Sequence, residues 1–481
     1  MSWILGVIYI LNFITILTIL FIERKKQSIA FTWILIMTFL PVVGFILYPF
    51  LGRNLRPNQK KLFKLKREFD ILYSERLQKK NLLSNEATSY IDESTHKYQG
   101  LISMNYSAGN SVYYQDNTID IFTKGTDKFN SLLKDIENAK DTIHMLYYII
   151  NNDGIGCEVV SLLTKKAKEG VEVRLLYDHV GSILTPQKMF SDLIKAGGSV
   201  CRFFPLSLGT YTRVNYRNHR KIVIIDGMIG YIGGMNIGDE YLGLHKQLTP
   251  WRDTHLRITG TSVYALQERF LMDWYYASKI KEDTDAATLS KFFPPMQPQG
   301  KIGLQVLSSG PDVSGEQIKR GYIKMINSAK KKLFIQTPYF IPDEPFLEAL
   351  QIAALSGVDV RIMLPSIADH TIVHHATNSY LNDILSYGIK VYLYQGFIHS
   401  KMIVIDGEVT SIGTANMDVR SFSSNFEINT FIYNTEFSNK CNDIFEKDID
   451  SSKLLTKEAY DLRGRRAKIK EGLCRLLSPL L

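Results

Sequence analysis

The chain of 481 residues contains only four cysteines, and they lie far apart. No C-x-x-C pair or regular spacing connects Cys157, Cys201, Cys441 and Cys474. This pattern argues against a disulfide framework and a structural zinc site, and it is typical of a reducing compartment. A hydrophobic content of 45% and a charged content of 22% predict a globular fold, and the length predicts more than one packed unit.

The body of the chain lacks net charge, although the whole chain has a formal charge of +9. Ten of the 57 basic residues lie before residue 68, where only Glu23 opposes them, which leaves 47 basic and 47 acidic residues for the remainder. A nuclease would need a basic groove on the body, so this neutrality argues against nucleic acid as a partner. A basic excess at one end instead fits an anionic membrane surface.

Two runs without charge, Trp3–Ile22 and Ile29–Leu51, occupy the start of the chain. Each is long enough to cross about 30 Å of hydrocarbon as a helix, so we expect a transmembrane hairpin over residues 1–51. Pro41 and Gly44 are expected to kink the second helix or make it re-entrant. Basic residues are enriched after the second run, which predicts a multi-pass protein of the cell membrane with its body in the cytoplasm.

Residues 100–285 and 300–450 repeat the same order of strand-like and helix-like segments. The runs KDTIHMLYYII, EGVEVRLLYD and SVCRFF of the first part match KKLFIQTPYFI, SGVDVRIMLP and IKVYLYQ of the second. Helical patterns such as EVVSLLTKKAK and FLEALQIAAL separate them. Strands that alternate with helices predict parallel sheets covered on both faces, so the repeat indicates an α/β fold of two related halves that face each other.

A fourth matched segment in each half carries polar residues at identical spacing. The two segments read NHRKIVIIDGMIGYIGGMN and IHSKMIVIDGEVTSIGTAN. Each has His, Lys two residues later, Asp five after that, Gly seven further and Asn three beyond. The candidate catalytic residues are His219, Lys221, Asp226, His399, Lys401 and Asp406. Because residues i and i+2 of a strand point to one side, each His and its Lys are expected to enter one pocket.

These residue types suit attack on an anionic phosphodiester, and they predict neither a metal nor a cofactor. A neutral imidazole can attack phosphorus while a second, protonated imidazole donates to the departing alkoxide. The lysine ammonium groups and the amides of Asn236 and Asn416 would hold the non-bridging oxygens. Asp226 and Asp406 each begin an Asp-Gly turn, so they are expected to be structural clamps as much as catalysts.

A catalytic histidine needs a partner that fixes its tautomer. Asp253, in WRDTHLRITG, and Glu427, in NFEINTFIY, lie at corresponding places downstream of the two motifs. We predict that these carboxylates orient the two histidines. The alternative for each is a solvated strand carboxylate without a catalytic role.

With both motifs identified, the chain resembles the phospholipase D superfamily, whose mark is H-x-K-x4-D followed by a Gly-rich turn and Asn. Within it, PWRDTH, QTPYFIPD, GFIHSKMIVIDG, GTANMDVRSF and a closing RLLSPLL resemble bacterial cardiolipin synthases. The resemblance implies two phospholipase D-type halves, with mixed sheets flanked by helices, behind the hairpin. The expected ranges are 1–51 for the hairpin, 52–98 for a basic connector, 99–295 and 296–455 for the halves, and 456–481 for a basic amphipathic C-terminal segment.

The resemblance implies transfer of a phosphatidyl group from one phosphatidylglycerol to another, giving cardiolipin and glycerol through a phosphohistidine intermediate. It assigns nucleophilic attack to His219 and general acid–base work to His399. The implied partners are phosphatidylglycerol, other anionic phospholipids and the membrane, with the oligomeric state left open. The alternatives are a phospholipase D that uses water and releases phosphatidic acid, a nuclease, and a non-catalytic membrane scaffold.

Overall fold

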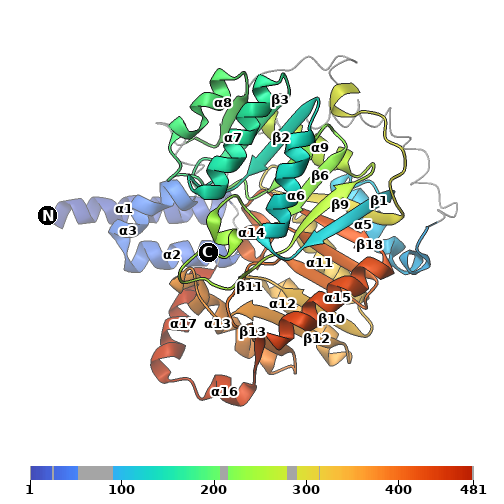
Figure 1. Ribbon diagram of the computed structural model, residues 1–481. Helices are drawn as coiled ribbons and strands as arrows, with labels where there is room; N and C mark the ends of the chain where they lie inside the picture. The colour runs from blue at the N-terminus through green and yellow to red at the C-terminus, as the bar shows by residue number, and fades with distance from the viewer. Residues whose placement is uncertain are drawn as a thin grey trace.

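The computed structural model describes residues 2–23, 27–52, 90–205, 215–278, 290–313 and 315–478. Most of the predicted basic connector, 52–98, therefore lies outside the described residues. Figure 1 shows a group of N-terminal helices that projects from one side of an α/β body.

The first charge-free run forms one long helical stretch, whereas the second run is broken. The elements are α1 (Ser2–Thr18), the π-helix η1 (Ile19–Glu23), α2 (Gln27–Phe39), α3 (Pro41–Leu47) and the π-helix η2 (Tyr48–Gly52). The stretch Trp3–Phe21 is long and apolar enough to cross a membrane. Because Pro41 has no amide hydrogen, α2 ends before it and α3 begins with it. The predicted kink is confirmed, but the second predicted span is not one continuous helix.

Asn12 of α1 compensates for this break. Its side-chain amide donates to the carbonyl oxygens of Pro41 at 2.9 Å and Met37 at 3.4 Å. Trp33, Met37 and Tyr48 belong to a small buried cluster between these helices. In an apolar environment a freed backbone carbonyl needs an intramolecular donor, and Asn12 supplies it. The N-terminal helices therefore form a packed unit.

The body is built on one 15-stranded sheet, to which each half contributes a matching set of strands. The first-half strands are β1 (Tyr114–Phe122), β2 (Thr142–Tyr147), β3 (Glu172–Asp178), β4 (Ser199–Phe203), β5 (Ile222–Ile225), β6 (Ile229–Gly233) and β8 (His255–Thr259). The second-half strands are β9 (Ile302–Ser309), β10 (Lys332–Gln336), β12 (Asp359–Pro365), β13 (Lys390–Tyr394), β15 (Met402–Ile405), β16 (Val409–Gly413), β18 (Glu427–Tyr433) and β19 (Ser452–Leu455). From the central antiparallel pair β9–β1, the order is β9-β18-β16-β15-β10-β12-β13-β19 on one side and β1-β8-β6-β5-β2-β3-β4 on the other. The strand order thus repeats as the sequence predicts.

The sheet is mixed, so the prediction of parallel sheets from the strand–helix alternation was wrong. Strands β2, β3 and β4 pair in parallel, as do β10, β12 and β13, whereas the strands between these two groups pair antiparallel. Two of these antiparallel pairs, β5–β6 and β15–β16, are hairpins closed by the Asp-Gly turns, where Asp226 and Asp406 adopt φ values of 52° and 53°. A tight hairpin forces antiparallel pairing of the strands that it joins. The mixed sheets implied by the family resemblance are present.

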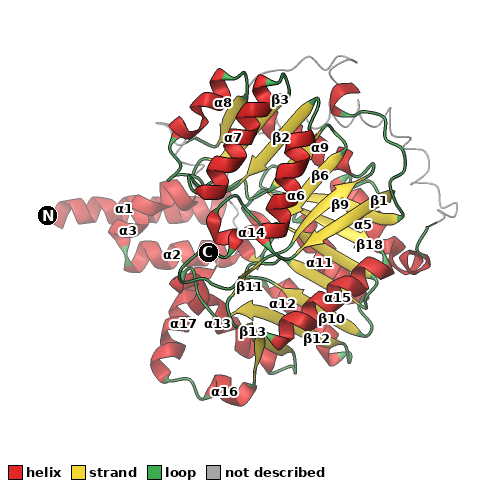
Figure 2. Ribbon diagram, viewed as in Figure 1, coloured by secondary structure: helices red, strands yellow, loops and turns green. Residues whose placement is uncertain are grey.

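Helices cover both faces of the sheet (Figure 2). They are α5 (Gln99–Gly109), α6 (Gly125–Asn138), α7 (Gly154–Lys168), α8 (Ser191–Lys195), α9 (Val263–Ser278), α11 (Gln317–Ser328), α12 (Glu344–Leu355), α13 (Thr371–Leu385), α14 (Val419–Ser423), α15 (Thr435–Asp450), α16 (Lys457–Asp461) and α17 (Arg465–Leu477), with 3-10 turns η4 (Glu93–Tyr98), η5 (Gln187–Phe190) and η7 (Asp239–Leu242). One core lies under α6 and α7, one under α11 and α12, and a third joins α9 and α15 to strands of both halves. Both faces of the sheet are therefore buried.

Two small parallel ladders lie apart from the main sheet. One pairs β7 (Trp251–Arg252) with β14 (Phe397–Ile398), and the other pairs β11 (Phe340–Ile341) with β17 (Met417–Asp418). The first ladder joins the two halves directly ahead of one motif histidine.

Candidate active site

Each motif histidine is held by the backbone of the opposite half. The amide of His219 donates to the carbonyl of Phe426 at 2.9 Å, and the amide of His399 donates to the carbonyl of Arg252 at 2.6 Å. Phe426 and Arg252 each directly precede one of the predicted orienting carboxylates. The same backbone contact, made twice, therefore brings each histidine to a carboxylate of the other half.

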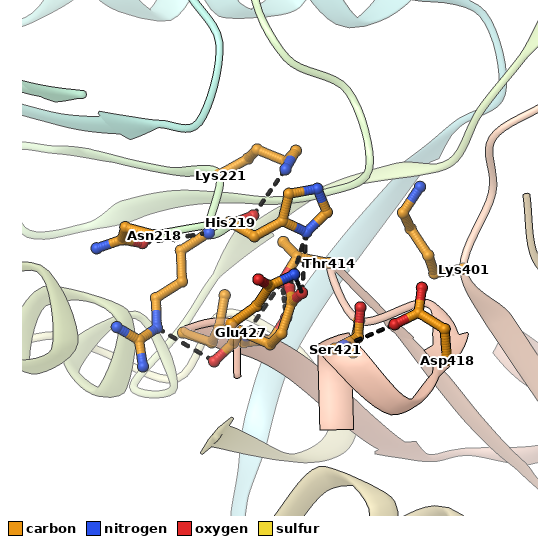
Figure 3. A network of polar contacts seen from close by, with 12 residues as sticks. Asn218, His219, Lys221, Lys401, Thr414, Asp418, Ser421 and Glu427 are labelled. Atoms are coloured by element: carbon orange, nitrogen blue, oxygen red, sulfur yellow. Dashed lines mark hydrogen bonds and ion pairs between the residues drawn. The ribbon is translucent and has the colours of Figure 1, made fainter. Parts of the chain in front are cut away.

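The histidine–carboxylate pairs cross between the halves. Nδ1 of His219 lies 3.0 Å from both carboxylate oxygens of Glu427, and Nδ1 of His399 lies 2.7 Å from Oδ2 of Asp253. Figure 3 shows Glu427 below the imidazole of His219. All four residues are buried. Because a carboxylate only accepts hydrogen bonds, each imidazole donates its Nδ1–H and keeps Nε2 for chemistry.

Lys221 and Lys401 place two ammonium groups at the same site. Nζ of Lys221 donates to the carbonyl of His219 at 2.6 Å, and Nζ of Lys401 makes the same bond to the carbonyl of His399. In Figure 3 both ammonium groups lie on the side of His219 away from Glu427. The His-Lys segments precede strands β5 and β15 instead of lying within them, and the amide of each histidine bonds to the other half.

The motif aspartates lie apart from the histidines. The carboxylate of Asp226 accepts the amides of residues 140, 141 and 142 at 2.7–2.9 Å, where strand β2 begins. Asp406 binds the amides of residues 330, 331 and 332 at 2.7–2.9 Å, where β10 begins. Seven residues of extended chain separate each Asp from its His, roughly 20 Å. The structure therefore places Asp226 and Asp406 as clamps at the edge of the sheet, away from the histidines, which agrees with the structural part of their predicted role.

An Asp226→Asn variant is expected to unfold at a lower temperature than the wild type. The substitution keeps the turn geometry but removes one acceptor oxygen and the negative charge that three amides share, a loss of about 2 kcal/mol. Thermal unfolding of the purified protein measures this effect. Asp192→Asn, at an exposed side chain, is the matched control, and an Asp226→Asn midpoint equal to that of the control would contradict the clamp.

The two motif asparagines differ in their surroundings. Asn236 accepts the amide of Ile149 through Oδ1 at 3.1 Å and donates through Nδ2 to the hydroxyl of Tyr241 at 2.5 Å. Asn416 is also buried, but its Oδ1 has no hydrogen-bond partner among the described residues. Asn236 thus has a structural function that the sequence did not reveal, while Asn416 keeps an unused polar group.

Comparison with known proteins agrees with this geometry. The family model described as "Cardiolipin synthase, PLD-like domain" matches residues 132–274 and 322–449, and the "Phospholipase_D-nuclease N-terminal" model matches residues 10–53. The chain is 47% identical to the major cardiolipin synthase ClsA of Bacillus subtilis (strain 168), covering 100% of this chain and 99% of that protein. The chain belongs to the cardiolipin synthase family. The family resemblance drawn from the two motifs is confirmed.

One further relative supports the family, and one solved structure supports the fold. A cardiolipin synthase of Listeria monocytogenes serotype 4a is 45% identical over 100% of this chain and 99% of its own length. The crystal structure of phosphatidylserine synthase from Haemophilus influenzae Rd KW20 matches with a TM-score of 0.61 at 14% identity, covering 80% of this chain and all of that one. At 14% identity, the likeness to the phosphatidylserine synthase structure shows a shared fold alone.

Burial sets the protonation of both histidines in this family member. It lowers the pKa of His219 to about 4, a shift that Glu427 opposes and Lys221 reinforces. Burial also lowers the pKa of His399, and Lys401 adds to that shift. Although burial alone would raise the pKa of Glu427, the adjoining His219 keeps it below its usual value. Both imidazoles are therefore neutral, and the carboxylate partner of His219 is ionised.

Burial lowers the pKa of the two lysines as well, to about 7 for Lys221 and about 8 for Lys401. Their mutual repulsion adds to the shift of Lys221, while Glu427 opposes it. An anion that entered between them would favour both ammonium forms. The two buried lysines therefore suit an anionic group.

Several residues of the site carry no motif signal. Thr414 donates to Oε2 of Glu427 at 2.6 Å, whereas a side chain at the matching Gly234 would place Cβ 2.1 Å from Asp253. This difference explains why one half has threonine where the other needs glycine. The rings of Trp251 and Phe397 pack against His399, with centroids 5.5 and 5.9 Å from its own. The sequence signal for these two rings is their position, since each lies two residues before Asp253 or His399.

Among the described residues, no group of three or more His, Cys, Asp or Glu side chains lies close enough to hold a metal ion. The polar groups at the site are nitrogen donors and hydrogen-bonded carboxylates, which suit an anion.

Proposed function

We propose that this chain transfers a phosphatidyl group from one phosphatidylglycerol to another and releases cardiolipin and glycerol. The main observation in support is the buried pair of histidines, each bonded to a carboxylate of the other half, with two lysines at the same site. Full-length identity of 45–47% to curated cardiolipin synthases supports the same reaction.

In the first step, Nε2 of His219 attacks the phosphorus of the donor lipid. The nitrogen–phosphorus bond forms and the bond from phosphorus to the glycerol oxygen breaks. Glu427 accepts the Nδ1–H of His219 and stabilises the positive charge that develops on the ring. The bound phosphodiester raises the pKa of His399, which binds a proton and passes it to the departing glycerol oxygen.

The two lysines hold the non-bridging oxygens through both steps. Each uses one of its three donors on a histidine carbonyl, so further donors face the substrate. Asn416 keeps an unpartnered Oδ1, which is an acceptor, and we assign it to a hydroxyl of the substrate head group, with Asn236 supporting the loop after β2. The lysine ammonium groups stabilise the charge of the transition state without reorganising.

In the second step, His399 is neutral again and accepts the hydroxyl proton of a second phosphatidylglycerol. The new oxygen–phosphorus bond forms as the nitrogen–phosphorus bond of His219 breaks, which gives cardiolipin. Water in place of the second lipid would give phosphatidic acid. Because burial lowers its pKa, His399 is poised as a base once glycerol has left.

The direct test uses detergent-purified protein with labelled phosphatidylglycerol, in buffer that contains a chelator. We expect labelled cardiolipin and free glycerol. Phosphatidic acid with glycerol as the main products would instead assign the chain as a hydrolase, and strict dependence on an added metal would contradict the metal-free mechanism.

The pH dependence of kcat/KM tests the role of the lysines. We expect kcat/KM to fall above about pH 7 to 8, because the free enzyme loses the ammonium charges of Lys221 and Lys401 there. A guanidinium stays protonated throughout this range, so Lys221→Arg is expected to shift the fall to higher pH. Lys332→Arg, at an exposed position, is the control. An unshifted alkaline limb in Lys221→Arg would contradict the proposal.

The proposed arrangement in the cell follows from the same features. We place α1 across the membrane and α2 with α3 as the returning, kinked arm of a hairpin, supported by the Asn12 bonds to the carbonyls at the kink. The two halves, 99–295 and 296–455, face each other across the crossed histidine pairs in the cytoplasm. The basic residues after the hairpin support this side of the membrane.

A further inference from the structure

The C-terminal helix α17 exposes an apolar stripe. Ile469, Leu473 and Leu476 are 63%, 61% and 51% exposed. They recur at i, i+4 and i+7, so they lie on one face of the helix. The opposite face is buried: Glu471 is 4% exposed, and Cys474 packs against the second-half core. The stripe therefore points away from the body.

Cationic side chains border this stripe. Arg465, Arg466, Lys468 and Lys470 are all exposed. At 3.6 residues per turn, Arg465 and Lys468 fall on one side of the stripe, and Arg466 and Lys470 fall on the other. An apolar stripe between two rows of cations is the pattern of a helix that lies in a membrane interface.

Helix α17 is fixed rigidly to its surroundings on two sides. Arg475 binds Asp383 of α13 at 2.6 Å and donates to the carbonyl of Ser379 at 3.1 Å. The carbonyl of Leu476 accepts the hydroxyl of Thr32, which lies in α2, at 3.2 Å. Figure 1 shows α17 next to α13, with the C-terminal end of α17 close to α2. The stripe is therefore continuous with the apolar N-terminal helices.

Helix α13 lies between α17 and the active site. Thr377 of α13 accepts the amide of Phe340 through its hydroxyl at 3.2 Å. Phe340 belongs to β11, which pairs with β17 directly after Asn416. Helix α13 thus connects α17 to the ladder β11–β17, which adjoins Asn416.

We propose that α17 docks on an anionic bilayer, with Ile469, Leu473 and Leu476 inserted below the head groups and the flanking cations on lipid phosphates. Together with the N-terminal helices, it makes a two-point attachment that fixes the tilt of the body. This attachment holds the active site at the level of the head groups. The anionic character assigned to the bilayer rests in part on the proposed phosphatidylglycerol substrate.

Continuity and charge favour a bilayer over a protein partner. The stripe adjoins α2 through the Thr32 bond, so a membrane that holds the N-terminal helices passes beside α17. Four exposed cations on one short helix would repel the same helix of a second copy. They match an anionic surface, which attracts basic side chains close to it.

Fluorescence quenching tests the docking without reading catalysis. Full-length protein carrying Cys157→Ser, Cys201→Ser and Cys474→Ser, with the buried Cys441 retained, is labelled with bimane at Leu473→Cys. It is reconstituted in vesicles of phosphatidylglycerol and phosphatidylcholine that contain doxyl-labelled lipid. The matched control is Leu355→Cys. Leu355 is 72% exposed and is the last residue of α12, shortly before β12 begins.

The doxyl lipid is expected to quench about half of the bimane emission at position 473 and to leave position 355 unchanged. Equal quenching at both positions would overturn the proposal. Emission at 473 that responds to protein density but not to doxyl lipid would assign the stripe to contacts between copies, which also overturns it.

Activity gives a second readout. Leu473→Asp is expected to lower cardiolipin formation from vesicles about tenfold and to leave the rate on monodisperse short-chain phosphatidylglycerol unchanged. Leu355→Asp should change neither rate. Loss on both substrates in Leu473→Asp, or on neither, contradicts the docking. A wild-type protein that forms no cardiolipin from either substrate would refute the proposed function, whereas the quenching result would stand by itself.

Discussion

His219→Ala is expected to form cardiolipin at least about 10⁴-fold more slowly than the wild type, because it lacks the atom that bonds to phosphorus. The substitution removes a mostly buried ring but leaves Glu427 bonded to Thr414 and Asn425, so the protein should remain folded. Initial rates with labelled phosphatidylglycerol measure the effect. His245→Ala, at an exposed histidine of the same half, is the control.

The order of the two histidines is tested by trapping the covalent intermediate. His399→Ala lacks the acid of the first step and the base of the second, so the trap uses a donor lipid whose p-nitrophenolate head group leaves without a proton. With this donor His399→Ala is expected to accumulate phosphatidyl label on the protein, because His219 can still attack while the second step lacks its base. His219→Ala should acquire no label. Label on His219→Ala, with none on His399→Ala, would reverse the assignment of nucleophile and general acid–base.

Glu427→Gln is expected to lower kcat by about 10⁴-fold with little change in KM, in line with the loss seen when a triad carboxylate becomes an amide. Glutamine keeps the shape of the side chain but cannot hold the ring with Nδ1 protonated and Nε2 free. It also cannot balance the charge that develops on His219 during attack.

The pH profile separates this effect from a packing defect. Without the ionised carboxylate that opposes its shift, the pKa of His219 falls further below its ordinary value. His219 then stays neutral to lower pH, so the fall of activity on the acid side should move to lower pH. Glu436→Gln, at an exposed helix position, controls for the loss of one negative charge. A Glu427→Gln variant with at least half of wild-type kcat would remove the carboxylate from the mechanism.

The spacing of the repeated motif was enough to predict that His219, Lys221, His399 and Lys401 form one site. Residue types in a fixed pattern, found twice, constrain chemistry strongly because few other functions need both copies. The crossing of the carboxylates was beyond the sequence. His219 and Glu427 are 208 residues apart, and only the packing of one half on the other selects that partner.

Local signals explain why the sheet is not parallel, why the second apolar run is not one helix, and why Asp226 and Asp406 lie away from the histidines. The seven-residue gap from His219 to Asp226 already places the aspartate at the far end of a strand, and two Asp-Gly hairpins already imply antiparallel pairs. The alternation of strands and helices by itself favours parallel pairing, which the two hairpins interrupt. Pro41 likewise breaks what hydropathy alone presents as one continuous span.

The crossed carboxylates make each half an incomplete catalyst. Half of the chain expressed alone would carry its own histidine and lysine, yet it would lack the carboxylate that sets the tautomer of that histidine. Two identical copies of one half, arranged about a twofold axis, would supply each other's missing group. Fusion of such a pair into one chain would then let the two histidines diverge, one toward bond formation and one toward proton transfer, while the seam β9–β1 preserves the exchange.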